Sequence, residues 1–431
     1  MIHDNLKIND KGNLAFANCD TTTLAKKYGT PLMVMDEDRV RSHIRTYKNA
    51  MEKSFGAKAM PLYASKALCF KGMYKIAKEE GIGIDVVSSG EIYTAVLAGF
   101  PMEKAFFHGN NKTDQDIKYA INSKVGFFVA DNIEELDAID NYAKIANIKQ
   151  KVLLRLTPGI DPDTHKAVCT GNIDSKFGQA IGTNQADFIT TYALSKKNIE
   201  LKGFHCHIGS QIFDCQPFID AADIMLNFIA EIDKKYGYMA EYLNLGGGFG
   251  VRYTKDNPQI DYEQNIIKIS DHIKELCKKY DIKMPIILME PGRSLVADAG
   301  ITLYTVGSVK EIPGFKNYVS IDGGMTDNPR YALYQSPYTV LVANKASKKA
   351  DYKCTIAGRC CESGDLIQED VTITKPQRGD VLAVLVTGAY NYAMSSNYNK
   401  IPRPPIVMVS NGKDSLAVRR ETIEDLARLD V

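Results

Sequence analysis

The sequence predicts an α/β protein in which a (β/α)8 barrel of the TIM type is joined to a second, all-β domain of sandwich or barrel form. From residue 31 onward, short apolar runs alternate with amphipathic, charged segments, a pattern typical of strand–helix units around a parallel sheet. After about residue 299 the pattern changes to short β-rich runs separated by Gly, Pro and Asn. A chain of 431 residues is also too long for one ordinary core, so two domains are expected.

Eight apolar runs supply the predicted barrel strands. They span residues 62–65, 82–87, 105–108, 126–130, 152–156, 201–208, 242–245 and 286–289. Eight parallel strands with intervening helices over roughly 250 residues match the size of a (β/α)8 barrel. A doubly wound open sheet would show a similar alternation, but it would concentrate polar residues at one switch point.

The second domain is predicted to be discontinuous. Its strands are expected at residues 302–309, 318–321, 339–343, 354–357, 371–374, 381–386, 406–409 and 416–419. The first thirty-odd residues also have a β-like pattern and are candidates to pair with these strands. The predicted limits are residues 37–299 for the barrel, and residues 1–36 with 300–431 for the all-β domain.

The composition excludes several classes of function. An apolar content of 45% and a charged content of 24% are those of a soluble globular protein. A formal charge of +1, with Lys and Glu dispersed, leaves no basic face for nucleic acid or for a charged membrane surface. The chain has neither a signal-peptide pattern nor a membrane-spanning apolar run, so a cytoplasmic location is expected. Nine cysteines without metal-type spacing predict free thiols.

A lysine follows the first predicted barrel strand. Lys66 stands directly after the run Pro61-Leu62-Tyr63-Ala64-Ser65. A lysine at the end of a buried strand loses its proton more easily than one in water, because desolvation disfavours the ammonium form. Such an amine can attack a carbonyl carbon. From this segment alone, a lysine that merely extends into solvent is the simpler interpretation.

Polar residues also follow the other predicted strands. They are Asp85, His108, Arg155, His207, Gly246 to Gly248 and Glu290. Because the carboxyl ends of barrel strands converge on one face, these dispersed residues are expected to form one pocket.

Two histidines, His205 and His207, fall on the same face of one predicted strand. They could bind a metal ion together with Asp85, His108 or Glu290. Alternatively, one of them could stack on the ring of an aromatic cofactor. Histidines that are simply hydrogen-bonded by their neighbours are the third interpretation.

Two further motifs are candidates for binding an anion or a ring nitrogen. Gly246-Gly247-Gly248, with Ser210 on the preceding loop, could hold a phosphate through backbone N–H groups, although tight packing alone would also explain the glycines. Glu290-Pro291-Gly292-Arg293 places a carboxylate and a guanidinium around one turn. The carboxylate could keep a pyridine nitrogen protonated and Arg293 could bind an anion, or the two could pair with each other.

Two polar loops interrupt the β-rich region. One is Cys360-Cys361-Glu362-Ser363-Gly364-Asp365, and the other is Gly388-Ala389-Tyr390-Asn391-Tyr392. Loops of this kind often carry function. Buried cysteines and a surface tyrosine are the alternatives.

In combination, the motifs resemble those of the fold-type III pyridoxal-phosphate decarboxylases. Seven motifs occur in the family's order, which is far more specific than any one of them. Within that family, the similarity is greatest to the enzymes that convert meso-2,6-diaminopimelate to L-lysine and carbon dioxide, the last step of lysine biosynthesis. The motifs are Tyr63-Ala64-Ser65-Lys66-Ala67, Ser175-Lys176-Phe177-Gly178, His205-Cys206-His207-Ile208-Gly209-Ser210-Gln211, Gly246-Gly247-Gly248-Phe249-Gly250, Glu290-Pro291-Gly292-Arg293-Ser294, Cys361-Glu362-Ser363-Gly364-Asp365 and Gly388-Ala389-Tyr390.

The resemblance implies pyridoxal 5'-phosphate as the cofactor, no metal, and a role for each motif. Lys66 would be the Schiff-base lysine, His207 would stack on the ring, Glu290 would face the ring nitrogen, and Cys361 would supply a proton after carbon dioxide leaves. The implied cofactor-binding residues are Lys66, Asp85, His207, Ser210, Gly246, Gly247, Gly248, Glu290, Pro291, Gly292, Arg293 and Tyr390. The implied substrate-binding residues are Arg293, Arg330, Tyr334, Glu362 and Tyr390.

The resemblance also implies a homodimer with shared active sites, in which Cys361 and Glu362 come from the partner subunit. Cys361 is preferred over Cys360 because Glu362 follows it directly. The segment at 322–334 contains the family's arginine and tyrosine, but its Asp327-Asn328-Pro329 portion departs from the commonest form.

Three alternatives remain open. The first is a decarboxylase of the same family for carboxynorspermidine, ornithine or arginine; a diamine-producing enzyme for ornithine or arginine would not need a clamp for a distal carboxylate. The second is a metal-dependent barrel hydrolase that uses His205 and His207. The third is a non-catalytic pyridoxal-phosphate carrier, which would not need the second domain with Cys361 and Tyr390.

Overall fold

The computed structural model describes residues 1–160 and 174–431. Its internal contacts group the chain into two units. Unit 1 comprises Met1–Ser42, Val251–Gln259 and Arg293–Val431, and unit 2 comprises His43–Gly250 and Ile260–Gly292. The domain limits at residues 37–299 and at 1–36 with 300–431 stay a prediction.

Unit 2 contains the predicted barrel of parallel strands. Eight strands are hydrogen-bonded in chain order, and the last pairs with the first to close the barrel. Each strand overlaps one of the eight apolar runs, so the barrel prediction is confirmed. The strands are β5 (Met60–Ala64), β6 (Gly83–Val86), β7 (Ala105–Phe107), β8 (Phe127–Ala130), β9 (Gln150–Thr157), β11 (Ile199–His205), β12 (Tyr242–Asn244) and β13 (Ile286–Met289), with the short β10 (Gln179–Ala180) paired to β9.

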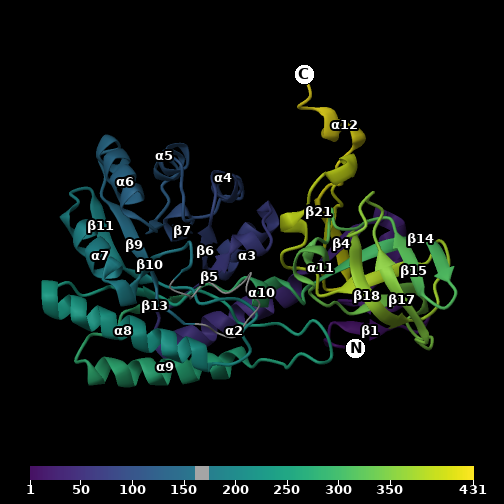
Figure 1. The fold of residues 1–431 in the computed structure, drawn as a ribbon, viewed down its shortest axis with the longest axis horizontal. Coiled ribbons are helices and arrows are strands. Elements are labelled where there is room, and N and C mark those ends of the chain that lie inside the picture. Colours follow the sequence, from purple (N-terminus) through teal and green to yellow (C-terminus); the bar gives the residue numbers. More distant parts are fainter. Residues whose placement is uncertain (161–173) are drawn as a thin grey trace. The chain divides into compact units, whose positions relative to one another are not determined.

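Helices alternate with these strands along the chain (Figure 1). Several begin at a side chain that caps the first turn; Thr113, for example, forms a reciprocal capping box with Asp116. The helices are α2 (Glu37–Phe55), α3 (Lys71–Glu80), α4 (Ser89–Leu97), α5 (Asp114–Asn122), α6 (Ile133–Ile145), α7 (Gln185–Ser195), α8 (Gln216–Tyr236) and α9 (Tyr262–Lys279), with the short turns η1 (Ser65–Ala67), η2 (Met102–Lys104) and η4 (Ile181–Thr183).

The barrel strands share a layer of large apolar side chains. Phe106 on β7 and Phe127 on β8 stack with ring centroids 4.4 Å apart and planes within 5°. Leu62, Val129, Leu153 and Leu288 complete this buried cluster. Because β5 and β13 both contribute to it, the cluster joins the first barrel strand to the last and favours closure of the barrel.

A buried ion pair connects the ends of β7 and β8. The Lys112 ammonium donates to Glu135 Oε1 at 2.6 Å and to the carbonyl oxygens of Gly109 and Val129 at 2.9 and 2.8 Å. We expect Lys112→Met to reduce the free energy of unfolding by about 3–5 kcal/mol, because it leaves the Glu135 carboxylate buried without its cation. Urea unfolding measures this loss.

The double variant Lys112→Met with Glu135→Leu is the matched control. It removes both charges and is expected to lose clearly less stability than the single variant. If the single variant lost less than about 1 kcal/mol, the ion pair would not be structurally important.

Unit 1 is built mainly from β-sheet, as predicted. Its longest strand, β14 (Gly300–Ile312), pairs antiparallel with β4 (Leu32–Asp36), β15 (Lys316–Ile321) and β19 (Val381–Leu385). The sheet order is β18-β17-β15-β14-β4-β20-β21, with β16 paired to β19. The remaining strands are β16 (Val340–Val342), β17 (Tyr352–Ala357), β18 (Leu366–Ile373), β20 (Ile406–Ser410) and β21 (Lys413–Val418).

The N-terminal segment contributes to unit 1 in two ways. Strand β4 lies between β14 and β20 in the large sheet, which confirms the predicted pairing. A small separate sheet contains β1 (Leu6–Ile8), β2 (Leu14–Phe16) and β3 (Cys19–Asp20). The helices of unit 1 are α1 (Thr21–Tyr28), α10 (Arg293–Val296), α11 (Arg330–Tyr334) and α12 (Ile423–Ala427), with short turns at η5 (Ala343–Lys345), η6 (Tyr392–Met394) and η7 (Tyr398–Lys400).

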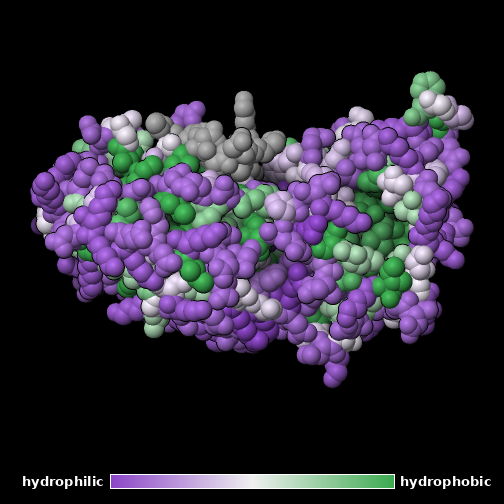
Figure 2. Space-filling view, turned by 90° about the horizontal axis from the view of Figure 1, so that it is seen from below, coloured by the Kyte–Doolittle hydropathy of each residue, from purple (hydrophilic) through white to green (hydrophobic). Residues whose placement is uncertain are grey.

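The surface and the cysteines agree with the composition. On the face drawn in Figure 2, hydrophilic side chains dominate and hydrophobic ones form scattered patches. Among the described residues, no helix has both the length and the apolar character needed to cross a membrane. The eight cysteines within the described ranges are all free, and Cys169 lies outside these ranges.

Candidate active site

Glu290, directly after β13, is the centre of a polar cluster at the carboxyl ends of the barrel strands. It is 6% exposed. Its Oε1 accepts a hydrogen bond from Asn244 Nδ2 at 2.7 Å and lies 2.9 Å from His108 Nε2. Its Oε2 lies 3.3 Å from His205 Nε2. Side chains at the ends of β7, β11 and β12 thus hold one carboxylate.

These neighbours keep the Glu290 carboxylate ionised. Burial alone would raise its pKa, but the charges and hydrogen bonds of His108 and His205 hold the pKa well below its ordinary value. Burial lowers the pKa of His205 to about 4, so its imidazole is neutral at physiological pH. A neutral ring that donates from Nε2 has no proton on Nδ1, and His205 Nδ1 has no hydrogen-bond partner within the described part of the chain.

Lys66 lies at the same end of the barrel. It is exposed, in the turn η1 directly after β5. The Tyr63 hydroxyl donates to the Leu68 carbonyl at 2.6 Å, which closes the turn around it. A side chain on Gly292 would meet Ala64 Cβ at 2.9 Å, so this glycine lets the 290–292 turn pack on the end of β5. Lys66 is therefore an exposed residue at the carboxyl end of a buried strand.

The Lys66 charge acts on the pKa of two carboxylates, Asp85 and Glu91, and in both it opposes the rise that burial causes. Asp85, at the end of β6, is buried with Oδ1 3.9 Å from His108 Nε2. Burial raises the pKa of Asp85, and His108 and Lys66 oppose that rise. Burial also raises the pKa of Glu91 to about 7, although its carboxylate accepts a hydrogen bond from the Val87 N–H at 2.7 Å.

Glu91 makes stability depend on pH. Its folded-state pKa, about 7, lies above the ordinary value of 4.5. The contribution of Glu91 to the free energy of unfolding is therefore present at low pH and is lost as the pH rises through 7. We expect Glu91→Gln to gain on the order of 2 kcal/mol relative to the wild type between pH 5 and pH 8. Urea unfolding of both proteins at the two pH values measures this, with surface Glu103→Gln as the control. Parallel pH dependence in the two proteins would show that Glu91 titrates normally.

The glycine-rich turn after β12 packs against neighbouring strand ends. A Cβ on Gly247 would lie 2.0 Å from the Glu290 carbonyl oxygen, and one on Gly248 would lie 2.6 Å from the Gly209 carbonyl oxygen. A Cβ on Gly246 would lie 2.8 Å from His207 Nδ1. Close packing therefore requires glycine at all three positions, and phosphate binding by their N–H groups stays a prediction. Ser210 is half-buried on the loop after β11.

His207 lies beyond the end of β11, beside this turn. Burial, with the Lys66 and Arg155 charges, lowers the pKa of His207 well below its ordinary value. Its imidazole is therefore neutral at physiological pH.

The motif Ser175-Lys176-Phe177-Gly178 is fixed to the ends of β8 and β9. The Gly178 N–H donates to Asp131 Oδ2 at 2.9 Å, and the Thr157 hydroxyl donates to the Phe177 carbonyl at 2.7 Å. The Arg155 guanidinium lies 4.3 Å from the centroid of the Phe177 ring. Arg155 therefore contacts this motif, and its charge also acts on Glu290 and Asp85.

In unit 1, two predicted arginines meet at one tyrosine. Arg293 Nη1 and Arg330 Nη1 donate to the Tyr253 hydroxyl oxygen at 2.7 and 2.8 Å. Burial would raise the Tyr253 pKa, but the two guanidinium groups lower it below its ordinary value. The Arg293 guanidinium also lies 4.8 Å from the ring centroid of Tyr390, and the Arg330 guanidinium lies 5.9 Å from that of Tyr334.

Tyr390 has an unusual backbone conformation. Its φ is +60°, in the left-handed region that only glycine adopts readily. Thirteen other non-glycine residues among those described also have a positive φ, so the conformation by itself assigns no role to Tyr390.

The loop with the paired cysteines also belongs to unit 1. Cys361 and Glu362 are exposed, whereas Cys360 is buried and burial raises its pKa to about 12. The buried Asp365 accepts hydrogen bonds from the Cys360 and Met325 N–H groups at 2.7 and 2.6 Å. The loop is therefore anchored while it presents Cys361 and Glu362 to the solvent.

The cluster around Glu290 is also the one group of metal-type ligands found among the described residues. Ligand atoms of His108, His205 and Glu290 lie within 4.8 Å of one another. His207, which the metal hypothesis paired with His205, is not part of this group. The observed contacts to the carboxylate are a hydrogen bond from His205 and a close approach of His108 Nε2 at 2.9 Å.

Asn244, Tyr253 and Glu91 were not among the residues predicted from the sequence, and Asp365 was named only as the end of a motif, without a role. A polar residue inside the apolar run Tyr242–Leu245 was a usable signal for Asn244, and the acidic end of the Cys360–Asp365 loop was one for Asp365. Tyr253 and Glu91 carry no comparable signal, because a single tyrosine or glutamate in a loop or helix is ordinary.

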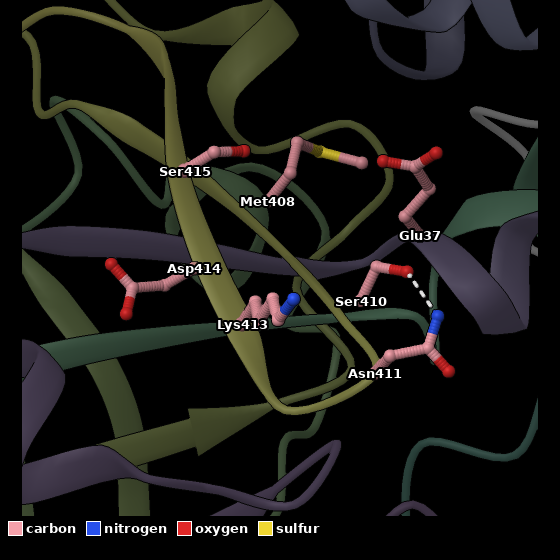
Figure 3. Close-up of a pocket in the computed structure, with 7 residues that line it drawn as sticks. All are labelled: Glu37, Met408, Ser410, Asn411, Lys413, Asp414 and Ser415. Atoms are coloured by element: carbon pink, nitrogen blue, oxygen red, sulfur yellow. Dashed lines mark hydrogen bonds between the residues drawn. The ribbon is translucent and has the colours of Figure 1, made fainter.

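A surface cavity of about 310 Å³ lies in unit 1, between the β20–β21 hairpin and the start of α2. Its lining residues are Glu37, Met408, Ser410, Asn411, Lys413, Asp414 and Ser415, and none of them is a candidate site residue (Figure 3). Asp414 is already hydrogen-bonded to Lys27 and Tyr28. The Ser410 hydroxyl and the Asn411 N–H are likewise hydrogen-bonded to Asp38, so the polar groups of the cavity are largely occupied.

Comparison with known proteins gives one consistent result. The family model described as pyridoxal-dependent decarboxylase, pyridoxal binding domain, matches residues 38–297. Diaminopimelate decarboxylase from Bacillus methanolicus is 46% identical over 97% of this chain and 97% of its own length, and that from Bacillus subtilis is 45% identical over 100% and 98%. The solved structure of the M. jannaschii diaminopimelate decarboxylase in co-complex with L-lysine has a TM-score of 0.90 and 36% identity, covering 99% of this chain and 98% of that one.

Proposed function

The chain belongs to the family of pyridoxal-dependent decarboxylases, and from this membership we propose that it converts meso-2,6-diaminopimelate to L-lysine and carbon dioxide. The observation that carries the proposal is the ionised Glu290, held by His108, His205 and Asn244 at the same end of the barrel as the exposed Lys66 amine. The M. jannaschii relative was solved with L-lysine, the product of this reaction.

The residues at the barrel mouth fit pyridoxal phosphate. A protonated pyridine nitrogen needs an anionic acceptor, which Glu290 provides, and an aldehyde needs an accessible amine, which Lys66 provides. Pyridoxal phosphate, when bound, supplies a pyridinium ring that accepts the electron pair left by departing carbon dioxide. We assign to Lys66 the covalent attachment of the aldehyde carbon, and to Glu290 the hydrogen bond that keeps the ring nitrogen protonated.

Other residues would orient the cofactor. The neutral imidazole of His207 is suited to stacking on an aromatic ring without placing a positive charge against it. The buried Asp85, at the same end of the barrel, is also assigned to cofactor binding. Phosphate contacts are assigned to N–H and O–H donors, since these groups and a guanidinium bind phosphate oxygens. The residues assigned to the phosphate are Ser210, Gly246, Gly247, Gly248 and Tyr390. Pro291, Gly292 and Arg293 are assigned to cofactor binding without a phosphate contact.

The substrate carries two amino-acid ends, and the end that does not react needs its own ligands. We assign its carboxylate to Arg293, Arg330 and Tyr334, and its ammonium to Glu362. The Cys361 thiol would give its proton to the carbon that carbon dioxide leaves, and an exposed thiol suits this role better than the buried Cys360. Ornithine and arginine have no distal carboxylate, so they would leave the arginine pair without an anion.

We propose that the protein is a homodimer with shared active sites. Cys361 and Glu362 are exposed on an anchored loop, which suits residues that act on a second subunit. Mixing inactive Lys66→Ala with inactive Cys361→Ala is therefore expected to restore up to about a quarter of wild-type activity, because one site of each heterodimer regains both residues. Verified heterodimers without any recovery would contradict a composite site.

The test of the proposed function is carbon dioxide release from meso-diaminopimelate, with and without added pyridoxal phosphate. Release that depends on the cofactor supports the proposal. Faster release from carboxynorspermidine, ornithine or arginine would assign the protein to another branch of the family. A stoichiometric zinc content with no turnover of any of these amino acids would favour the metal-dependent hydrolase instead.

We further propose that the protein works in the cytoplasm and that residues 37–299 form its barrel domain. Eight free cysteines in the described residues suit a reducing compartment, where disulfides are rare. Fractionation of cells that produce the protein tests the location, and limited proteolysis tests the domain limits.

A further inference from the structure

The loop that follows the glycine-rich turn of the barrel has a segment that belongs to unit 1. Within Val251–Gln259, the Tyr253 N–H donates to Asn257 Oδ1 at 3.0 Å, and the Tyr253 carbonyl accepts from the Thr339 hydroxyl at 2.9 Å. The Tyr253 ring packs edge-on against Tyr338 with centroids 5.5 Å apart. Backbone and ring of Tyr253 are therefore both fixed, and the side chain is only 4% exposed.

Two cationic side chains converge on the single oxygen of Tyr253. Arg293 and Arg330 are 7% and 6% exposed, and each donates one guanidinium N–H to that oxygen. The other hydrogen bond of Arg330 goes to the Ser336 hydroxyl at 3.0 Å, and its Nε has none among the described residues. Within the described ranges, Arg330 has no carboxylate partner. A buried cation whose hydrogen bonds go only to hydroxyl groups is costly unless an anion joins it.

The geometry gives Tyr253 a specific task. Two guanidinium groups repel each other, and a shared acceptor sets their separation. A phenol oxygen that accepts two hydrogen bonds still has its own O–H to donate, and the natural acceptor beside two cations is an anion.

We infer that Tyr253 is a positioning residue that fixes Arg293 and Arg330 at the spacing needed to bind the carboxylate of an α-amino acid. This inference rests on the proposed function, in which these arginines hold the end of the substrate that survives in L-lysine. It adds a specificity determinant outside the seven motifs.

The experiment compares ligands with and without that carboxylate. On the Tyr253→Phe holoenzyme, dissociation constants are measured by calorimetry for L-lysine and for 1,5-diaminopentane, which is L-lysine without its carboxylate. We expect L-lysine to bind about ten-fold more weakly, because the acceptor that two guanidinium groups share is lost, and 1,5-diaminopentane to bind within about two-fold of wild type. The KM for meso-diaminopimelate should rise in parallel with little change in kcat.

Tyr331→Phe is the matched control. Tyr331 is also buried and stands next to Arg330, but its hydroxyl donates to Glu369 at 2.9 Å and to no guanidinium. Its removal should leave the L-lysine affinity unchanged. Equal losses for both ligands in Tyr253→Phe, or an unchanged L-lysine affinity, would overturn the inference. An inactive wild type would instead refute the proposed function.

A second pair of variants covers the case in which Tyr253→Phe does not fold. Gln and Leu are similar in size, but only Gln offers an oxygen that accepts a hydrogen bond from a guanidinium. Tyr253→Gln is therefore expected to bind L-lysine more tightly than Tyr253→Leu. Equal affinities in these two variants would mean that the acceptor oxygen is not what matters.

Discussion

Lys66→Ala is expected to abolish decarboxylation. The exposed amine at the end of β5 is the group assigned to bind the aldehyde of the cofactor, and alanine has no nucleophile to replace it. We expect kcat to fall on the order of a thousand-fold or more. Borohydride reduction followed by mass spectrometry is expected to find the cofactor joined to residue 66 in the wild type and to no residue in the variant.

Lys71→Ala is the control, because Lys71 is exposed at the start of the next helix and has no assigned role. It should retain wild-type activity and the reducible adduct. An adduct on another lysine in wild-type protein would remove the basis of the mechanism, and normal turnover by Lys66→Ala would do the same.

Glu290→Gln should cause the second-largest loss, with kcat falling about 100- to 1,000-fold and KM changing less. The substitution keeps the shape of the side chain but removes the charge that would keep the ring nitrogen protonated. It also places an amide N–H₂ group where Oε1 accepts from Asn244 or where Oε2 accepts from His205, so one donor must face another.

The pH dependence gives Glu290 a second test. Its pKa lies well below 4.5, so its contribution to stability is present above that pH and is lost only as the pH falls through the folded value. Between pH 6 and 9, titration of Glu290 should therefore cause no rise or fall in the activity of the wild type. Glu275→Gln, on the exposed face of α9, is the control. A kcat within three-fold of wild type in Glu290→Gln would show that the carboxylate is not needed.

The barrel was predictable because its strands are short apolar runs at regular intervals, each followed by a polar residue. Leu62, Phe106 and Leu288 show why the signal is strong: they point into one shared layer, so every strand must carry apolar residues. The all-β unit was predictable in outline, since its apolar runs alternate with turn residues. The two pairings of β14 with β4 and β19 join residues far apart in sequence, which no local pattern encodes.

The candidate site was predictable only where chemistry and motif coincide. Lys66 and Glu290 stand at strand ends within recognisable motifs, whereas the contacts that tune them come from neighbours without one. Asn244 contacts Glu290 through its side-chain amide. Tyr253 lies in a loop that follows a barrel strand in sequence but belongs to unit 1. Such partners depend on the three-dimensional path of the chain, so residue spacing does not reveal them.

The position of β4 has a consequence for how the chain is made. Ribosomes synthesise β4 early, yet its two sheet neighbours, β14 and β20, emerge roughly 270 and 370 residues later. During that interval its buried residues Leu32, Met33, Val34 and Met35 have no native partner. Nascent chains that stall before β14 therefore expose an apolar, strand-forming segment. We expect such chains to depend on chaperones and to aggregate when chaperones are scarce.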